Sequence, residues 1–147
     1  MKEIYDLGYQ EIGDFDLIAR TVFELDALLI DIRLKAQSPT PVWRAQAFSS
    51  KLGARYRHLP ELGNVNYRST GEIKIRDLQK GLGTVLQLVK MTNLVLMCAC
   101  KNRQGCHRQA VAWEIQNNHG ISVHPLTVTY CIALAYHALQ PDLIPNP

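Results

Sequence analysis

Three of the four cysteines lie together in one short segment, as Cys98, Cys100 and Cys106, and His107 and Arg108 follow directly. Thiol, imidazole and guanidinium groups can act as a nucleophile, a proton-transfer group and an anion ligand. An apolar run precedes the segment and a helical pattern follows it, which predicts a loop between a strand and a helix. Ligands of open α/β folds bind beyond the carboxyl ends of the strands. We therefore expect the functional site at this loop.

Cys106 is expected at the start of the helix, where unpaired amides and the helix dipole stabilise negative charge. The nearby basic residues Lys101, Arg103, His107 and Arg108 also favour a thiolate over a thiol. The same features would hold a phosphate or a sulfate. The sequence thus predicts an anion-binding loop in which Cys106 and His107 are the catalytic pair, as nucleophile and proton-transfer group.

Other interpretations of the loop stay open beside this one. Cys98, Cys100, Cys106 and His107 form a Cys₃His set for a metal, but Cys-x-Cys is a tight spacing and an adjacent Cys-His pair is awkward for joint coordination. Redox pairing of Cys98 or Cys100 with Cys106 lacks the usual Cys-x-x-Cys spacing. A phosphatase loop needs an arginine where this chain has Gln104 or Cys106. We therefore assign no metal and no phosphatase activity from the sequence.

A second group of candidates follows the apolar run 27–30. Asp31 is expected to orient Arg108 or His107, or to act as a base. Arg33 and Arg108 are expected to hold the anion. The competing interpretation of Asp31 is a structural ion pair or a cap for the following loop.

The remaining candidates for ligand contact are Tyr9, Tyr56, His58 and Glu61. Tyr9 follows the first expected strand. Tyr56 and His58 share one face of another strand, where they could stack on a base or a sugar or simply pack together. Glu61 is a candidate acid, and a solvated loop residue is the alternative.

Alternating strands and helices position these residues. Strands are expected at 2–7, 27–30, 55–59, 93–97 and 121–126, and helices at 15–25, 41–51, 72–91, 108–118 and 127–139. In the second of these helices Thr40 is the expected cap and Pro41 the first residue. This order predicts an α/β fold: a single-domain three-layer sandwich with a mainly parallel sheet of about five strands. Residues 1–126 form the α/β domain, and 127–147 form a helix and a Pro-rich tail that pack on it or extend from it.

Composition limits the choice of function. The chain has 147 residues, 47% of them hydrophobic and 20% charged, with a formal net charge of +3, values that are ordinary for a globular protein. It has no apolar run of membrane-spanning length and no signal-peptide core at its N-terminus. We expect a cytoplasmic location without membrane association, where cysteines stay reduced. The expected partner is an anionic small molecule or a nucleic acid, and the sequence indicates no particular cofactor or oligomeric state.

Several strings of residues together resemble the domain of unknown function 488 family over about residues 2–126. In chain order the strings are Asp31-Ile32-Arg33, Ser38-Pro39, Phe48, Leu52, Tyr56-Arg57-His58-Leu59-Pro60-Glu61-Leu62-Gly63, Leu96-Met97-Cys98-Ala99 and Cys106-His107-Arg108. The resemblance implies a compact α/β domain and no particular activity.

The chain departs from that family pattern at two places. The family typically has a histidine after the glycine that ends its first strand, and here Gly8 is followed by Tyr9 and Gln10. The family often has a glutamate where this chain has Cys100. We expect an enzyme-like domain that binds a phosphate, nucleotide or nucleic acid. The alternatives are a non-catalytic nucleic-acid-binding or regulatory module and a Cys/His metal-binding protein.

Overall fold

A five-stranded sheet forms the centre of the molecule, and the computed structural model describes residues 1–69 and 71–139 around it. The strands lie in the order β3-β2-β4-β1-β5, and every pair is parallel. Their bounds are β1 (Ile4–Gly8), β2 (Ala27–Asp31), β3 (Tyr56–His58), β4 (Asn93–Cys98) and β5 (Val123–Pro125). The α/β fold and the sheet of about five strands are therefore confirmed, and the sheet is wholly parallel.

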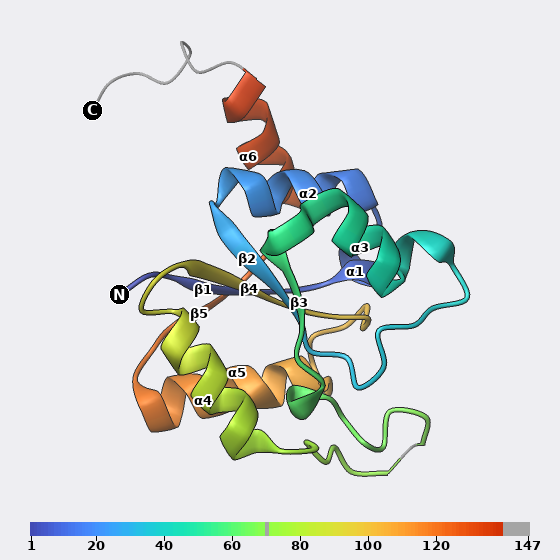
Figure 1. Cartoon of the computed structure of the whole chain (residues 1–147), viewed down its shortest axis with the longest axis vertical. Coiled ribbons are helices and arrows are strands. Elements are labelled where there is room, and N and C mark those ends of the chain that lie inside the picture. Colours follow the sequence, from blue (N-terminus) through green and yellow to red (C-terminus); the bar gives the residue numbers. More distant parts are fainter. Residues whose placement is uncertain (70, 140–147) are drawn as a thin grey trace.

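Helices cover both faces of this sheet (Figure 1). One face carries α1 (Tyr9–Ile12), α2 (Phe15–Glu24), α3 (Ala45–Leu52) and α6 (Val128–Leu139). The other face carries α4 (Leu78–Leu88) and α5 (His107–His119). Each face has its own apolar core, as expected for a parallel sheet buried on both sides.

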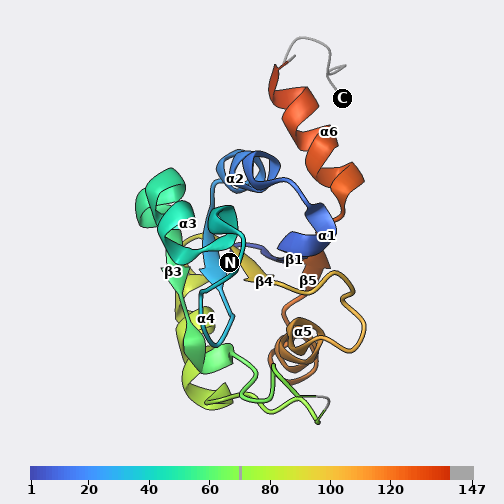
Figure 2. The ribbon, with the colours of Figure 1, turned by 90° about the vertical axis from the view of Figure 1, so that its right-hand side faces the viewer.

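The last helix, α6, lies outside α2 and leads away from the sheet (Figure 2). Its buried residue Cys131 belongs to the same core cluster as the inner face of α2. The helix expected after residue 126 is therefore present, and it both packs on the domain and extends from it. The Pro-rich tail expected beyond it, residues 140–147, lies outside the described residues.

Local signals fix the ends of two helices where the sequence placed them. The side chain of Asp14 accepts a hydrogen bond from the amide of Leu17 at 3.0 Å and so caps α2. Gly120 ends α5 with φ of 65°, a left-handed conformation that glycine adopts at little cost. The start of α5 at His107 places Cys106 at its N-cap, as the loop analysis predicts.

The helix expected over 72–91 is shorter, because its first residues bond to another loop. The carbonyl of Lys74 accepts from the amide of Val65 at 2.8 Å, and the amide of Arg76 donates to Gly63 at 3.0 Å. Helix α4 begins only at Leu78, where the Asp77 side chain accepts from the amide of Lys80. The glycines inside α4 do not break it.

The helix expected from Pro41 is divided. A 3₁₀ turn covers Pro41–Trp43, α3 follows from Ala45, and the side chain of Thr40 makes no capping bond. The amide of Ala45 donates to Ala36 at 3.1 Å, which breaks the helical bonding at this point.

The last strand is also shorter than expected. It ends at Pro125, a residue that an edge strand tolerates because the missing amide faces no partner strand.

Among the helices in residues 1–69 and 71–139, none combines the length and the apolar composition that a membrane crossing requires.

Candidate functional site

The carboxyl ends of three neighbouring strands, β2, β4 and β1, meet at one edge of the sheet. The cysteine loop that follows β4 thus begins between the ends of β1 and β2. A cavity of about 520 Å³ opens at this edge, with Cys100, Cys106 and His107 on one side and Tyr9 and Arg33 on another. A more open hollow of about 820 Å³ lies beside β5. None of the cysteines lines it, so the smaller cavity is the candidate site.

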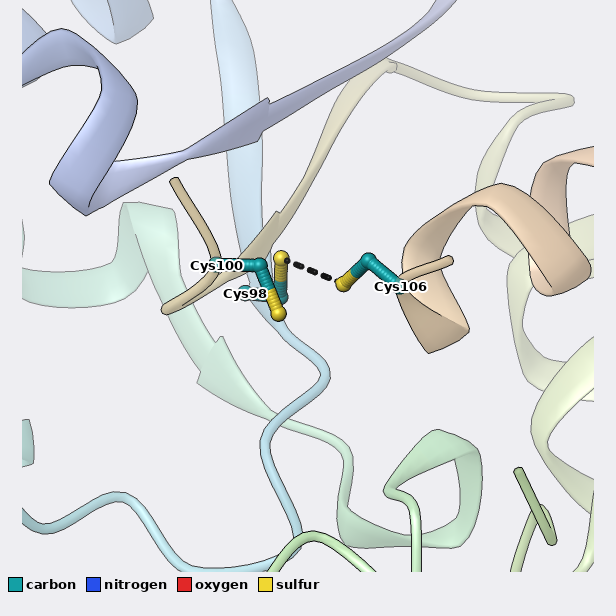
Figure 3. A group of neighbouring side chains, drawn as sticks. All are labelled: Cys98, Cys100 and Cys106. Carbon is teal, nitrogen blue, oxygen red and sulfur yellow. Dashed lines mark hydrogen bonds between the residues drawn. The ribbon is translucent and has the colours of Figure 1, made fainter. Parts of the chain in front are cut away.

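Three sulfur atoms lie together at this cavity (Figure 3). Cys98 is the last residue of β4, Cys100 is in the loop that follows, and Cys106 is the N-cap of α5. Their Sγ atoms all lie within 4.8 Å of one another, and those of Cys98 and Cys106 are 3.4 Å apart. All four cysteines of the chain are free thiols. Cys98 is fully buried at the end of β4, yet its sulfur still belongs to the cluster.

His107 lies between the sulfur cluster and strand β2. Its Nε2 is 3.0 Å from the carbonyl oxygen of Ile32, and its Nδ1 is 3.7 Å from Cys106 Sγ. A carbonyl can only accept, so Nε2 carries a hydrogen and Nδ1 faces the thiol. Burial alone would lower the pKa of His107, but hydrogen bonds with Cys100 and Cys106 outweigh it and raise the pKa to about 9.

The surroundings of Cys106 favour its thiolate form. Hydrogen bonds from Cys100 and then Cys98 lower the pKa of Cys106, helped by His107 and the amide of Arg108, against the opposing effect of burial. The same hydrogen bonds, together with burial, raise the pKa of Cys98. A thiolate at the N-terminus of α5 is also where the helix dipole favours an anion. The N-terminus of α5 is thus a position that favours a thiolate at Cys106.

Asp31 occupies the same edge but is bonded to other partners. Its carboxylate accepts from Arg33 Nε at 2.9 Å and Nη2 at 2.6 Å, and from the Tyr56 hydroxyl at 2.6 Å. Burial, followed by the charge of Asp31, raises the pKa of Tyr56, which keeps the phenol a neutral donor. Both oxygens of Asp31 are therefore occupied by Arg33 and Tyr56. This is the structural ion pair weighed as the alternative in the sequence.

Arg108 is 1% exposed and faces two carboxylates. Its Nη2 donates to Glu11 at 3.3 Å, and its Nε lies 3.7 Å from Asp6 Oδ1 without a hydrogen-bond partner among the described residues. Asp6 also pairs with Arg103, at 2.9 Å. The guanidinium expected to hold an external anion thus lies against the buried Asp6 of β1 and the more exposed Glu11 of α1.

Of the other residues expected to contact a ligand, some line the cavity and others do not. Tyr9 lines it, with the Arg33 guanidinium 5.2 Å from the centre of its ring. His58 donates from Nε2 to the carbonyl of Arg33 at 2.7 Å and so supports the cavity wall from behind. Glu61 pairs with Lys80 at 3.5 Å and is not among the lining residues. Tyr9 and Arg33 are thus brought to the site, and Glu61 is not.

Two features of the site escaped the sequence reasoning. The acids that hold Arg108 were not singled out, although Asp6 in the middle of an apolar strand is a signal, because a buried charge requires a partner. The second feature is the far wall of the cavity, which comes from the segment between Asn64 and Ile73. That segment has no regular periodicity, so nothing in its pattern indicated where it would fold.

Among the described residues, the three sulfurs form a group that could hold a metal ion, and His107 Nδ1 lies 3.7 Å from one of them, Cys106 Sγ. Without a metal, the same geometry places a thiolate with an adjacent proton donor at a cavity. Comparisons with family models, with curated proteins and with solved structures find no match to this chain.

Proposed function

We propose that the chain is an enzyme-like α/β protein that binds a small molecule in the cavity and uses Cys106 as its nucleophile. One observation carries the proposal: Cys106 Sγ lies at the start of α5, on the cavity wall, with His107 Nδ1 3.7 Å away. A nucleophile next to a group that moves its proton is the usual arrangement in covalent catalysis. The lowered pKa of Cys106 agrees with this role.

In the proposed reaction, one bond forms at Cys106 Sγ as the bond to a leaving group breaks. Cys106 Sγ gives an electron pair to an electrophilic centre of the ligand, and the bond from that centre to its leaving group breaks. The leaving group departs with the bonding pair and takes the proton from His107 Nδ1. Water that gives its proton to His107 Nδ1 then attacks the same centre, the bond from that centre to Cys106 Sγ breaks, and the product leaves with the thiolate regenerated. Asp31 takes no part in the transfer and acts by holding Arg33 at the cavity wall.

We also propose an anionic ligand, as expected from the sequence, although fewer basic groups are free to bind it. Arg33 and Arg108 are both paired with carboxylates, which leaves Lys35 and His107 as the basic groups on the cavity wall that could face a bound anion. A cavity of about 520 Å³ suits a small molecule, whereas a nucleic acid needs a dense basic face. We therefore propose a small phosphate- or carboxylate-bearing ligand in preference to a nucleic acid.

Two broader proposals follow from the same residues. Four free thiols fit a reducing compartment such as the cytoplasm. The string Cys106-His107-Arg108, at the head of a helix, supports membership in the domain of unknown function 488 family as a divergent chain.

Residue-resolved alkylation tests the nucleophile. Chelator-treated native protein is incubated with iodoacetamide at neutral pH, and the rate at each cysteine is followed by mass spectrometry of peptides. His107→Gln removes the imidazolium and is expected to slow alkylation of Cys106 at least about tenfold, equivalent to one unit of its pKa. His119→Gln is the matched control, since His119 is an exposed histidine on the same helix, and it should leave the rate unchanged.

Equal rates in the wild type and in His107→Gln would overturn the proposed pair. Circular dichroism spectra of both variants show whether α5 is intact. A slow rate in His107→Gln with wild-type spectra therefore reports on the thiol and not on the fold.

A further inference from the structure

We propose that Cys98, Cys100, Cys106 and His107 form a binding site for a Zn²⁺ ion, in which three thiolates and one imidazole surround the metal. The site arises because β4 ends where α5 begins, so that the loop between them turns all three sulfurs toward one point (Figure 3). The proposal concerns a second occupant of the cavity edge. It stands independently of the nucleophilic role of Cys106.

The sulfur spacing is the first argument. Zn–S bonds of about 2.3 Å in a tetrahedral site place two sulfurs ~3.8 Å apart. The structure has Cys98 and Cys106 Sγ 3.4 Å apart, and all three sulfurs within 4.8 Å. Small side-chain rotations therefore suffice to reach bonding geometry. Packing in a core does not require three sulfur atoms to be adjacent, whereas coordination of one ion does.

The second argument is independent and comes from His107. Bonds of about 2.3 Å to sulfur and about 2.0 Å to nitrogen place the two ligand atoms ~3.6 Å apart in a tetrahedral site. His107 Nδ1 lies 3.7 Å from Cys106 Sγ. Cys106 has an extended backbone and His107 is the first helical residue, so adjacent residues turn toward the same point. This distance fits Cys106 and His107 as joint ligands, and the three sulfurs are the part of the set that already lies together.

The ring nitrogen of His107 that faces away from the sulfurs, Nε2, has the hydrogen bond that metal-binding histidines usually make. Histidines bound to a metal usually donate their other ring N–H to a carbonyl or carboxylate, which fixes the ring. His107 Nε2 is 3.0 Å from the buried carbonyl of Ile32, next to β2. Only Nδ1 is then left to face the sulfurs, with its lone pair available when the ring is neutral.

Binding would change the chemistry of the site. Each coordinating thiol gives up its proton, and Zn²⁺ takes the electron pair with which Cys106 would attack a ligand. The one consequence that rests on the proposed function is therefore inhibition: the Zn²⁺-bound protein should not react at Cys106.

Metal titration tests the site directly. Reduced, chelator-treated full-length protein is titrated with Zn²⁺ against a chromophoric chelator, and with Co²⁺ to record the visible bands of a tetrahedral thiolate site. We expect one ion per chain. Removing a group that only supports a metal ligand weakens binding by up to about 100-fold. Cys100→Ser removes a ligand itself and should weaken Zn²⁺ binding by more than that. Cys131→Ser, which alters the one cysteine outside the cluster, should keep wild-type affinity.

The outcomes separate this site from the proposed function. No Zn²⁺ binding, or equal affinity in Cys100→Ser and wild type, would overturn the metal site. Rapid alkylation of metal-free Cys106 in the same protein would still support its role as the nucleophile. Zn²⁺ binding with a slow metal-free Cys106 would support the site and contradict the nucleophile. Protection of Cys106 by Zn²⁺ in the wild type but not in Cys100→Ser would support both.

Discussion

At the scale of single residues, the site depends on which charges are already paired. Arg33 lines the cavity and Arg108 follows His107 directly in the chain, and each lies against a buried carboxylate. Their burial explains why: an uncompensated charge in the interior costs several kcal/mol, so these side chains bond within the protein. These arginines therefore pair within the protein, and the anion that we propose at the start of α5 is the thiolate of Cys106.

Asp31→Asn should reduce the free energy of unfolding by about 3 kcal/mol, because it leaves Arg33 buried without its counter-charge. The matched control is Asp26→Asn at the other end of β2. Its ion pair with Arg55 is exposed, and its loss should cost less than about 1 kcal/mol. Urea denaturation followed by tryptophan fluorescence measures both. Similar losses for the two variants would contradict the role given to Asp31.

At the scale of elements, periodicity and caps predicted most of what positions the site. The apolar run that ends at Cys98 and the helix that begins near Cys106 follow from local patterns, and Asp14 and Gly120 mark helix ends in the expected way. The late start of α4 was not predictable in this way, because residues before Asp77 bond to a loop distant in sequence.

The partners of the site residues were also beyond local reasoning. Asp31 and Tyr56 meet because β2 and β3 pair in a register that brings their side chains together, and no sequence pattern specifies that register. Likewise, Arg108 meets Asp6 only after α5 packs beneath β1. Residue types and strand ends indicated where the site is, whereas tertiary packing decided which groups remain for a ligand.

The junction of β1 and α1 gives a test at this scale. A Cβ on Gly8 would overlap the carbonyl oxygen of Cys100, so only glycine lets the two backbones lie this close. Gly8→Ala should destabilise the protein by about 2 kcal/mol and shift the sulfur cluster, weakening Zn²⁺ binding. Gly83→Ala is the control. It lies in α4 with open space around it, and alanine there should stabilise by about 1 kcal/mol. Denaturation curves in which Gly8→Ala matches wild type would contradict this packing.

At the scale of the whole molecule, one ion-pair network joins the three layers. Asp6 lies in the central sheet, Arg108 comes from α5 on one face, and Glu11 comes from α1 on the other. Arg103 in the cysteine loop adds a fourth member. The network thus connects the sheet and both helical layers directly beside the sulfur cluster.

Asp6→Asn should therefore be the most damaging charge removal in the chain, costing about 4 kcal/mol, since Arg108 remains buried beside it. Glu11→Gln removes a carboxylate that is 36% exposed and should cost about 1 kcal/mol. Thermal and urea unfolding of the two variants, compared with wild type, measure the difference. A loss at Glu11 as large as that at Asp6 would contradict the central place of Asp6.

The central claim is that the cavity edge carries a reactive thiolate at Cys106. The most direct measurement is the ratio of iodoacetamide alkylation rates at Cys106 and Cys100 in metal-free native protein at neutral pH. Both cysteines line the cavity, and Cys100 is the more exposed, so accessibility alone favours Cys100. We predict that Cys106 reacts at least about tenfold faster, because the thiolate is the nucleophile. A rate at Cys106 equal to or below that at Cys100 would contradict the account.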